Sequence, residues 1–157
     1  MKLRWAAPCL LVLALGALVP AALSAQSTQP PPTQPPRQRP ASGGLDQNYP
    51  NPFNPETRIP FTVGDFPTCS DPARTYRVTL KIYNLLAQQV ATPVLVGGEA
   101  GVEGGRAIEN LTLPCRRYVA YWNGKYQGTD REVASGVYLY RLEVDGRAVV
   151  RKMIVAK

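Results

Sequence analysis

Residues 45–63 read LDQNYPNPFNPETRIPFTV, and they join a dense asparagine and proline segment to a segment with strand character. Each proline fixes its own φ and moves the preceding residue out of the helical region, while asparagine side chains bond nearby backbone amides. We therefore expect a rigid, irregular entry segment whose two aromatic side chains plug one end of a small domain. A recognition surface is the alternative role. The segment consists of Asn48, Tyr49, Pro50, Asn51, Pro52, Phe53, Asn54 and Pro55.

The strand that follows alternates apolar and polar residues over residues 58–63. Ile59, Phe61 and Val63 fall on one face, as in a half-buried strand. Pro60 has no amide hydrogen to give to a neighbouring strand, so the pattern favours an edge strand or one that begins as an edge strand.

Further short strand signals follow, separated by turn residues, and no long segment shows the 3.6-residue apolar period of a helix. Asp145-Gly146 is a strong two-residue hairpin signal between the last two strands. Because the length from residue 45 onward suits one small domain, the pattern predicts a single all-β, antiparallel β-sandwich. The expected strands cover residues 76–83, 90–96, 118–122, 137–144 and 148–155.

The N-terminal region has two parts with distinct compositions. Residues 1–25 carry Lys2 and Arg4, an apolar run and small residues, the layout of a signal peptide for the Sec translocon. A membrane anchor is the alternative, but the apolar run is short for a bilayer. Residues 26–44 are rich in Pro, Gln, Ser and Thr, which predicts a disordered, extended linker.

The cysteines indicate a structural disulfide and not a metal site or a catalytic thiol. Removal of the signal peptide takes away Cys9 and leaves Cys69 and Cys115 in a chain sent to an oxidising compartment. Alternating strands place both at one end of the sandwich, so we expect a disulfide, with two free thiols as the alternative. The chain has no histidine, so we expect no metal site, no cofactor and no Cys/His nucleophile. We expect a protein that is not an enzyme.

Several motifs resemble those of a known family. Besides residues 45–63, they are VTLKIYNLLAQQV at 78–90, Trp122-Asn123-Gly124, SGVY at 135–138 and RKMIVAK at 151–157. Together they resemble the C-terminal sorting domain of bacterial type IX secretion cargo, which is related to the immunoglobulin-like domain of the flagellar hook-capping protein. The resemblance covers residues 45–157 and implies an immunoglobulin-like sandwich that directs export across the outer membrane.

The same resemblance implies which residues the secretion machinery reads. Trp122 and Gly124 would form the turn that precedes the last hairpin. Ala87 departs from the family pattern, which has glycine there, and the turn after Gly124 is about one residue longer than usual. Export recognition would be carried by Gly136, Val137, Arg151, Lys152, Met153, Val155 and Lys157.

The formal net charge of +7 indicates which kinds of binding partner the protein could have. The basic residues are scattered, so we expect no nucleic-acid binding. A basic surface suits an anionic outer-membrane glycolipid, but a merely soluble charged surface is the stronger explanation. The expected partners are the Sec translocon and the type IX machinery, with the protein secreted or placed on the outer cell surface. The alternative is a stalked periplasmic or envelope binding and adhesion module that uses the same fold without this export.

Overall fold

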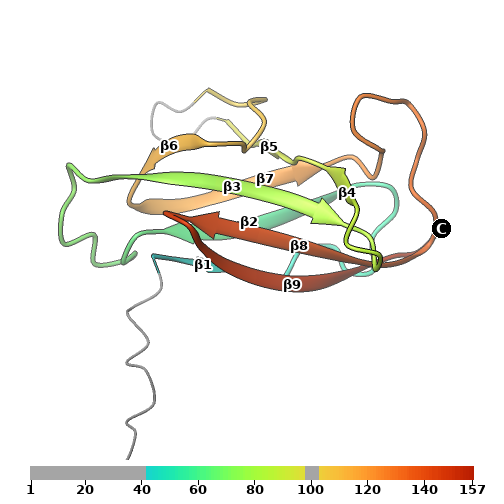
Figure 1. The fold of residues 1–157 in the computed structure, drawn as a ribbon, viewed down its shortest axis with the longest axis horizontal. Coiled ribbons are helices and arrows are strands. Elements are labelled where there is room, and N and C mark those ends of the chain that lie inside the picture. The colour runs from blue at the N-terminus through green and yellow to red at the C-terminus, as the bar shows by residue number, and fades with distance from the viewer. Residues whose placement is uncertain (1–41, 98–102) are drawn as a thin grey trace, which may run out of the picture. The chain divides into compact units, whose positions relative to one another are not determined.

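The computed structural model describes residues 42–97 and 103–157. The expected signal peptide and nearly all of the expected linker lie outside these residues. Two antiparallel sheets pack face to face, which confirms the expected β-sandwich (Figure 1). No helix in the described part of the chain is long and apolar enough to cross a membrane.

Each sheet combines strands that are distant in sequence. The first sheet has the order β1 (Gly43–Leu45), β2 (Thr57–Val63), β7 (Arg116–Trp122) and β5 (Val94–Leu95). The second has the order β4 (Gln89–Ala91), β3 (Thr75–Tyr83), β8 (Gly136–Val144) and β9 (Arg147–Val155), and β6 (Leu111–Pro114) also pairs with β3. β1 begins at Gly43, two residues before the expected start of the domain.

The core lies between the sheets and follows the period-two alternation. Ile59, Phe61 and Val63 of β2 are fully buried, as expected from their shared face. β3 contributes a matching row in which every second residue is buried. β8 lies between β3 and β9, as its apolar residues on both faces predict.

The expectation that residues 58–63 form an edge strand, or begin as one, is wrong, because even Arg58 pairs with Tyr49 on one side and Tyr121 on the other. β2 lies between β1 and β7, and Pro60 opposes Val119. On the other side, the Asp46 amide donates to the Pro60 carbonyl at 3.0 Å, although Pro60 cannot donate in return. The Asp46 carbonyl accepts the Tyr140 hydroxyl instead, at 2.8 Å. A side chain from the opposite sheet thus replaces the missing backbone donor.

The single strand expected over residues 90–96 is two strands in different sheets. β4 pairs with β3, whereas β5 pairs with β7. Pro93 lies between them and has no amide hydrogen for either ladder, so pairing stops where the chain crosses between the sheets.

The disulfide between Cys69 and Cys115 is present. The two Cα atoms are 5.6 Å apart and 46 residues apart in sequence. Cys69 lies in the connection from β2 to β3, and Cys115 lies between β6 and β7. The bridge therefore joins two connections at one end of the sandwich.

The turn after β3 holds a residue in a strained conformation. Ala87 has a φ of 58°, and its amide donates to the Asn84 carbonyl at 3.1 Å. The left-handed region costs a residue with a Cβ about 1–2 kcal/mol, whereas glycine enters it freely but loses more entropy on folding. We expect Ala87→Gly to raise the free energy of unfolding by about 0.5–1 kcal/mol, measured by urea denaturation.

The control is Ala73→Gly, at an exposed alanine whose φ is not positive. This variant should be slightly destabilised, because it adds backbone freedom without relieving strain. Equal losses at Ala87 and Ala73 would contradict the explanation.

Candidate recognition surface

The asparagine and proline segment lies against the C-terminal strand. The Phe53 amide donates to the Ile154 carbonyl at 3.0 Å, and the Ala156 amide donates to the Phe53 carbonyl at 3.0 Å. The Ile154 amide donates to Asn51 Oδ1 at 2.9 Å. These bonds form a short parallel pairing on the outer edge of β9. The two family-like motifs at opposite ends of the domain sequence therefore meet at one place.

Phe53 is the aromatic plug that the motif predicts. Its side chain is 2% exposed, and its ring centroid lies 5.5 Å from that of Trp122. Trp122 packs in turn on Tyr138, with centroids 6.0 Å apart. Tyr49, by contrast, is 49% exposed, so the expectation that it helps to plug the sandwich is wrong.

Gly124 allows the entry segment to approach the turn after β7. Its φ is 70°, and a Cβ at this position would lie 2.1 Å from the Pro55 carbonyl oxygen. No side chain fits at that distance. Trp122 Nε1 donates to the Lys125 carbonyl at 3.0 Å, which fixes the same turn from inside.

Buried polar groups hold the start of the segment. The Asn48 amide donates to the Tyr140 hydroxyl at 3.2 Å, and Asn48 Nδ2 donates to the Pro50 carbonyl and to Thr57 Oγ1, each at 3.0 Å. Burial raises the pKa of the fully buried Tyr140 above its usual range. The hydroxyl therefore stays protonated and keeps its donated bond over the physiological pH range.

The residues to which the resemblance assigns export recognition separate into three groups. Met153 and Val155 are buried in the core and face away from solvent. Arg151 is exposed, but its Nε donates to the Leu45 carbonyl and so joins β9 to β1. Gly136, Val137, Lys152 and Lys157 are exposed near the start of β8 and the end of β9. Of the assigned residues, only the exposed ones are open to a partner of the folded domain.

Two of the exposed residues have defined local roles. Gly136 has a φ of 154°, a backbone angle that residues with a Cβ rarely adopt. Lys157 Nζ lies 2.7 Å from Glu132 Oε2, and this hydrogen bond lowers the pKa of the Glu132 carboxyl. The Lys157 amide also donates to Ser135 Oγ at 3.1 Å, so the last residue is held against the loop before β8.

An apolar surface that the sequence did not reveal lies beside these residues. Val137 of β8 and Ile154 of β9 are cross-strand partners, 38% and 39% exposed. Leu85 and Leu86, in the turn that follows β3, are 69% and 78% exposed. We call this surface the terminal apolar patch, and it consists of Tyr83, Leu85, Leu86, Val137, Leu139 and Ile154.

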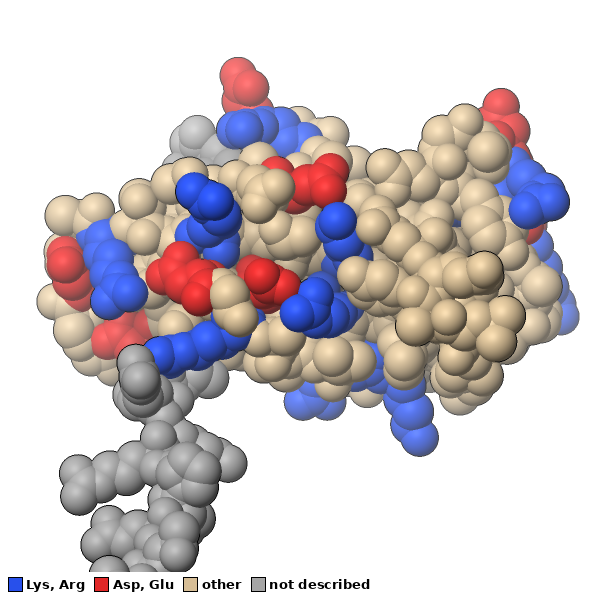
Figure 2. Space-filling model, viewed as in Figure 1, with Lys and Arg blue, Asp and Glu red and all other residues tan. Residues whose placement is uncertain are grey.

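Apart from Lys152, which opposes Leu139, most charged side chains of this face lie away from the patch. Figure 2 shows most of them over one half of the face and others along the opposite edge, and between them, where β3 ends and β8 begins, lies a broad area without Lys, Arg, Asp or Glu. Several charges on that half are paired, such as Lys81 with Glu109 at 3.0 Å and Arg141 with Glu143 at 2.8 Å. One half of this face therefore carries most of its charged side chains, and the terminal apolar patch lies outside that half.

Comparisons with known proteins do not assign a function to this surface. The chain matches no protein-family model, no curated protein and no solved structure. Among residues 42–97 and 103–157, no three His, Cys, Asp or Glu side chains gather as a metal site requires. The function of the chain must therefore be inferred from its sequence motifs and from the chemistry of its exposed side chains.

Proposed function

We propose that residues 45–157 are an export-recognition domain of the type IX kind, which the outer-membrane secretion machinery reads in its folded state. The observation that carries the proposal is the pairing of Phe53 with Ile154 and Ala156. It brings the two motifs that resemble the sorting family together, next to the terminal apolar patch. A receptor bound there contacts both motifs at once.

The chemistry of the patch suits a protein partner. Soluble monomers rarely expose large contiguous apolar patches, and such patches mark interaction sites. Here the apolar centre is Val137 and Ile154, with the leucine pair of the turn on one side. Lys152 opposes Leu139 across the same two strands and adds a positive charge at the margin. An apolar centre with a polar rim is the usual anatomy of a protein interface.

The proposal implies that recognition comes after folding. The Sec translocon delivers an unfolded chain, and the disulfide and the Phe53 pairing form only in the oxidising compartment beyond it. Because the patch combines β3, β8 and β9, it exists only after folding. Recognition in this scheme selects folded domains, and it needs no chemical step from the protein.

The double variant V137T/I154T tests the proposal. Threonine keeps the β-branched shape and strand preference but places a hydroxyl where Val137 has a methyl group and Ile154 has an ethyl group. We expect its export to the medium or cell surface to fall about tenfold, with accumulation in the periplasm. Fractionation and immunoblotting in a type IX-competent host measure this, and thermal unfolding should show little change because both sites are on the surface.

The matched control is Val96→Thr, at an exposed valine just after β5 in the other sheet. Its export should equal that of the unchanged protein. Normal export of the stably folded double variant would overturn the role of the patch.

A further inference from the structure

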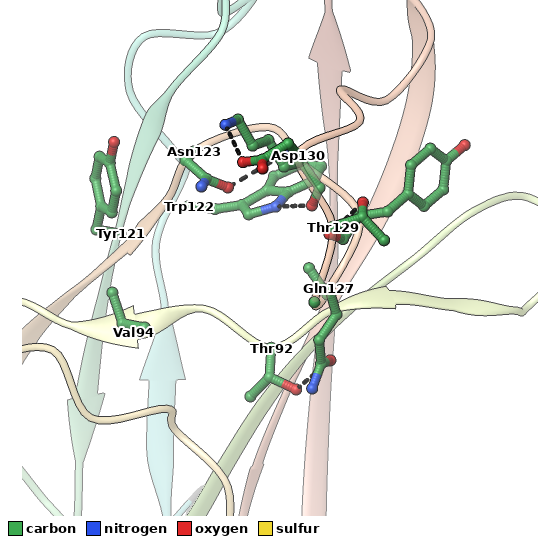
Figure 3. Close-up of a pocket in the computed structure, with 12 residues that line it drawn as sticks. Thr92, Val94, Tyr121, Trp122, Asn123, Gln127, Thr129 and Asp130 are labelled. Carbon is green, nitrogen blue, oxygen red and sulfur yellow. Dashed lines mark hydrogen bonds and ion pairs between the residues drawn. The ribbon is translucent and has the colours of Figure 1, made fainter.

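A hollow lies away from the terminal apolar patch, between the segment that contains β4 and β5, the end of β7 and the loop at residues 125–130. Its volume is about 460 Å³, within the range of about 300–1,000 Å³ for small-molecule sites. Figure 3 shows Tyr121 and Thr129 on opposite sides, with Thr92 and Gln127 below them. Trp122, which is 3% exposed, also lines the hollow. The site therefore combines aromatic and neutral polar groups.

Two polar side chains of the hollow, Asn123 and Gln127, are held in place through their side-chain oxygens, and their amide nitrogens can still donate hydrogen bonds. Asn123 Oδ1 accepts the Lys125 amide at 3.1 Å, which leaves Nδ2 without a partner among the described residues. Gln127 Oε1 accepts Thr92 Oγ1 at 3.2 Å and Gln89 Nε2 at 3.2 Å, so its Nε2 is likewise open within the described chain. Two oriented amide donors are thus available to a ligand.

The frame around these donors is rigid. The Gln127 amide donates to the Val90 carbonyl at 2.9 Å, and the Tyr126 amide donates to the Arg131 carbonyl at 3.0 Å. Across the hollow, the Tyr121 hydroxyl donates to Glu56 Oε2 at 2.6 Å. Pre-organised groups lose little freedom on binding, so a weak set of contacts still gives measurable affinity.

The charge of the hollow selects the class of ligand. Its ionised lining residues in the described chain are Lys125 and Asp130, whose side chains pair at 3.0 Å. With that pair closed, the lining has no net charge to attract an ion. Neutral amide and hydroxyl groups beside the Tyr121 ring match a ligand with many hydroxyls on an apolar ring face.

We propose that this hollow binds a neutral pyranose saccharide. The sugar hydroxyls accept from Asn123 Nδ2 and Gln127 Nε2, and its apolar face lies on the Tyr121 ring. The inference is independent of the export proposal, because the hollow uses the segment that contains β4 and β5, the end of β7 and the 125–130 loop rather than the terminal apolar patch. It would give the exported domain a ligand of its own.

The test is a titration of the isotope-labelled full chain with methyl glycosides of glucose, galactose, mannose and N-acetylglucosamine, followed by amide NMR. At least one glycoside should shift the signals of Asn123, Gln127 and Thr129 saturably. Asn123→Asp keeps the acceptor for the Lys125 amide but removes the open donor, so affinity should fall about three- to tenfold, the loss of one neutral hydrogen bond.

Variants of Tyr121 separate the ring from its hydroxyl. Tyr121→Phe should bind as the unchanged chain does, because the ring remains, whereas Tyr121→Leu should bind several-fold more weakly. Tyr83→Leu, at a tyrosine of the terminal apolar patch, is the control and should have no effect. Absence of saturable shifts with all four glycosides, or shifts confined to other residues, would overturn the proposal without bearing on export.

Discussion

Replacing Cys69 and Cys115 together by alanine is expected to lower the free energy of unfolding by roughly 4 kcal/mol. The bridge closes a chain separation of 46 residues, and the entropy removed from the unfolded chain by a loop of this length sets that magnitude. It joins two connections that lead into different sheets. Urea denaturation of the full chain, with and without the substitutions, measures the difference.

Reduction supplies the control for the cysteine substitutions. A thiol reductant should lower the midpoint of the unchanged protein toward that of the double variant and should leave the variant itself unaffected. A double variant within about 1 kcal/mol of the unchanged protein would contradict the structural role of the bridge, since removal of a native disulfide from a small secreted domain typically costs 2–5 kcal/mol.

Phe53→Ala is expected to lower the free energy of unfolding by about 3–5 kcal/mol, the usual range for removing a buried phenylalanine. Its ring is 2% exposed and packs on Trp122, and the cavity left behind would open between the entry segment and the core. Thermal and urea unfolding of the purified variant measure the loss. Because Phe53 pairs with Ile154 and Ala156, the variant should also loosen the end of β9, seen as faster amide exchange there.

Tyr49→Ala is the matched control in the same motif. Its side chain is half exposed, so the change should cost far less than the loss at Phe53. Similar losses at the two positions would mean that the motif stabilises the domain through its turns and not through an aromatic plug.

Local patterns in the sequence predict most of the sandwich. Alternation identified β2, β3, β7, β8 and β9, because one face of each strand packs on the opposite sheet. The hairpin predicted at Asp145-Gly146 is confirmed by the pairing of β8 with β9. The predicted disulfide between Cys69 and Cys115 is also confirmed. In each case the decisive information lies within a few residues or follows from the up-and-down order of strands.

The remaining features depend on contacts between distant residues. Pro60 sits inside a sheet because Tyr140, 80 positions along the chain, supplies the hydrogen bond that proline cannot. The terminal apolar patch joins the Leu85-Leu86 turn to Val137 and Ile154 through the register of three strands. The two consecutive leucines in a turn were the one local signal of that surface. Likewise, the hollow at Asn123 forms only where the 125–130 loop meets β4 and the residue Thr92 that follows it.

The export proposal is tested most directly by moving the domain onto foreign cargo. Residues 26–157 would be fused behind a periplasmic reporter enzyme and expressed in a type IX-competent bacterium and in an otherwise identical strain that lacks the outer-membrane machinery. We predict reporter activity in the medium or on the cell surface of the competent strain and in the periplasm of the other. Reporter activity confined to the periplasm of both strains would contradict the proposal and favour a stalked binding module that stays in the envelope.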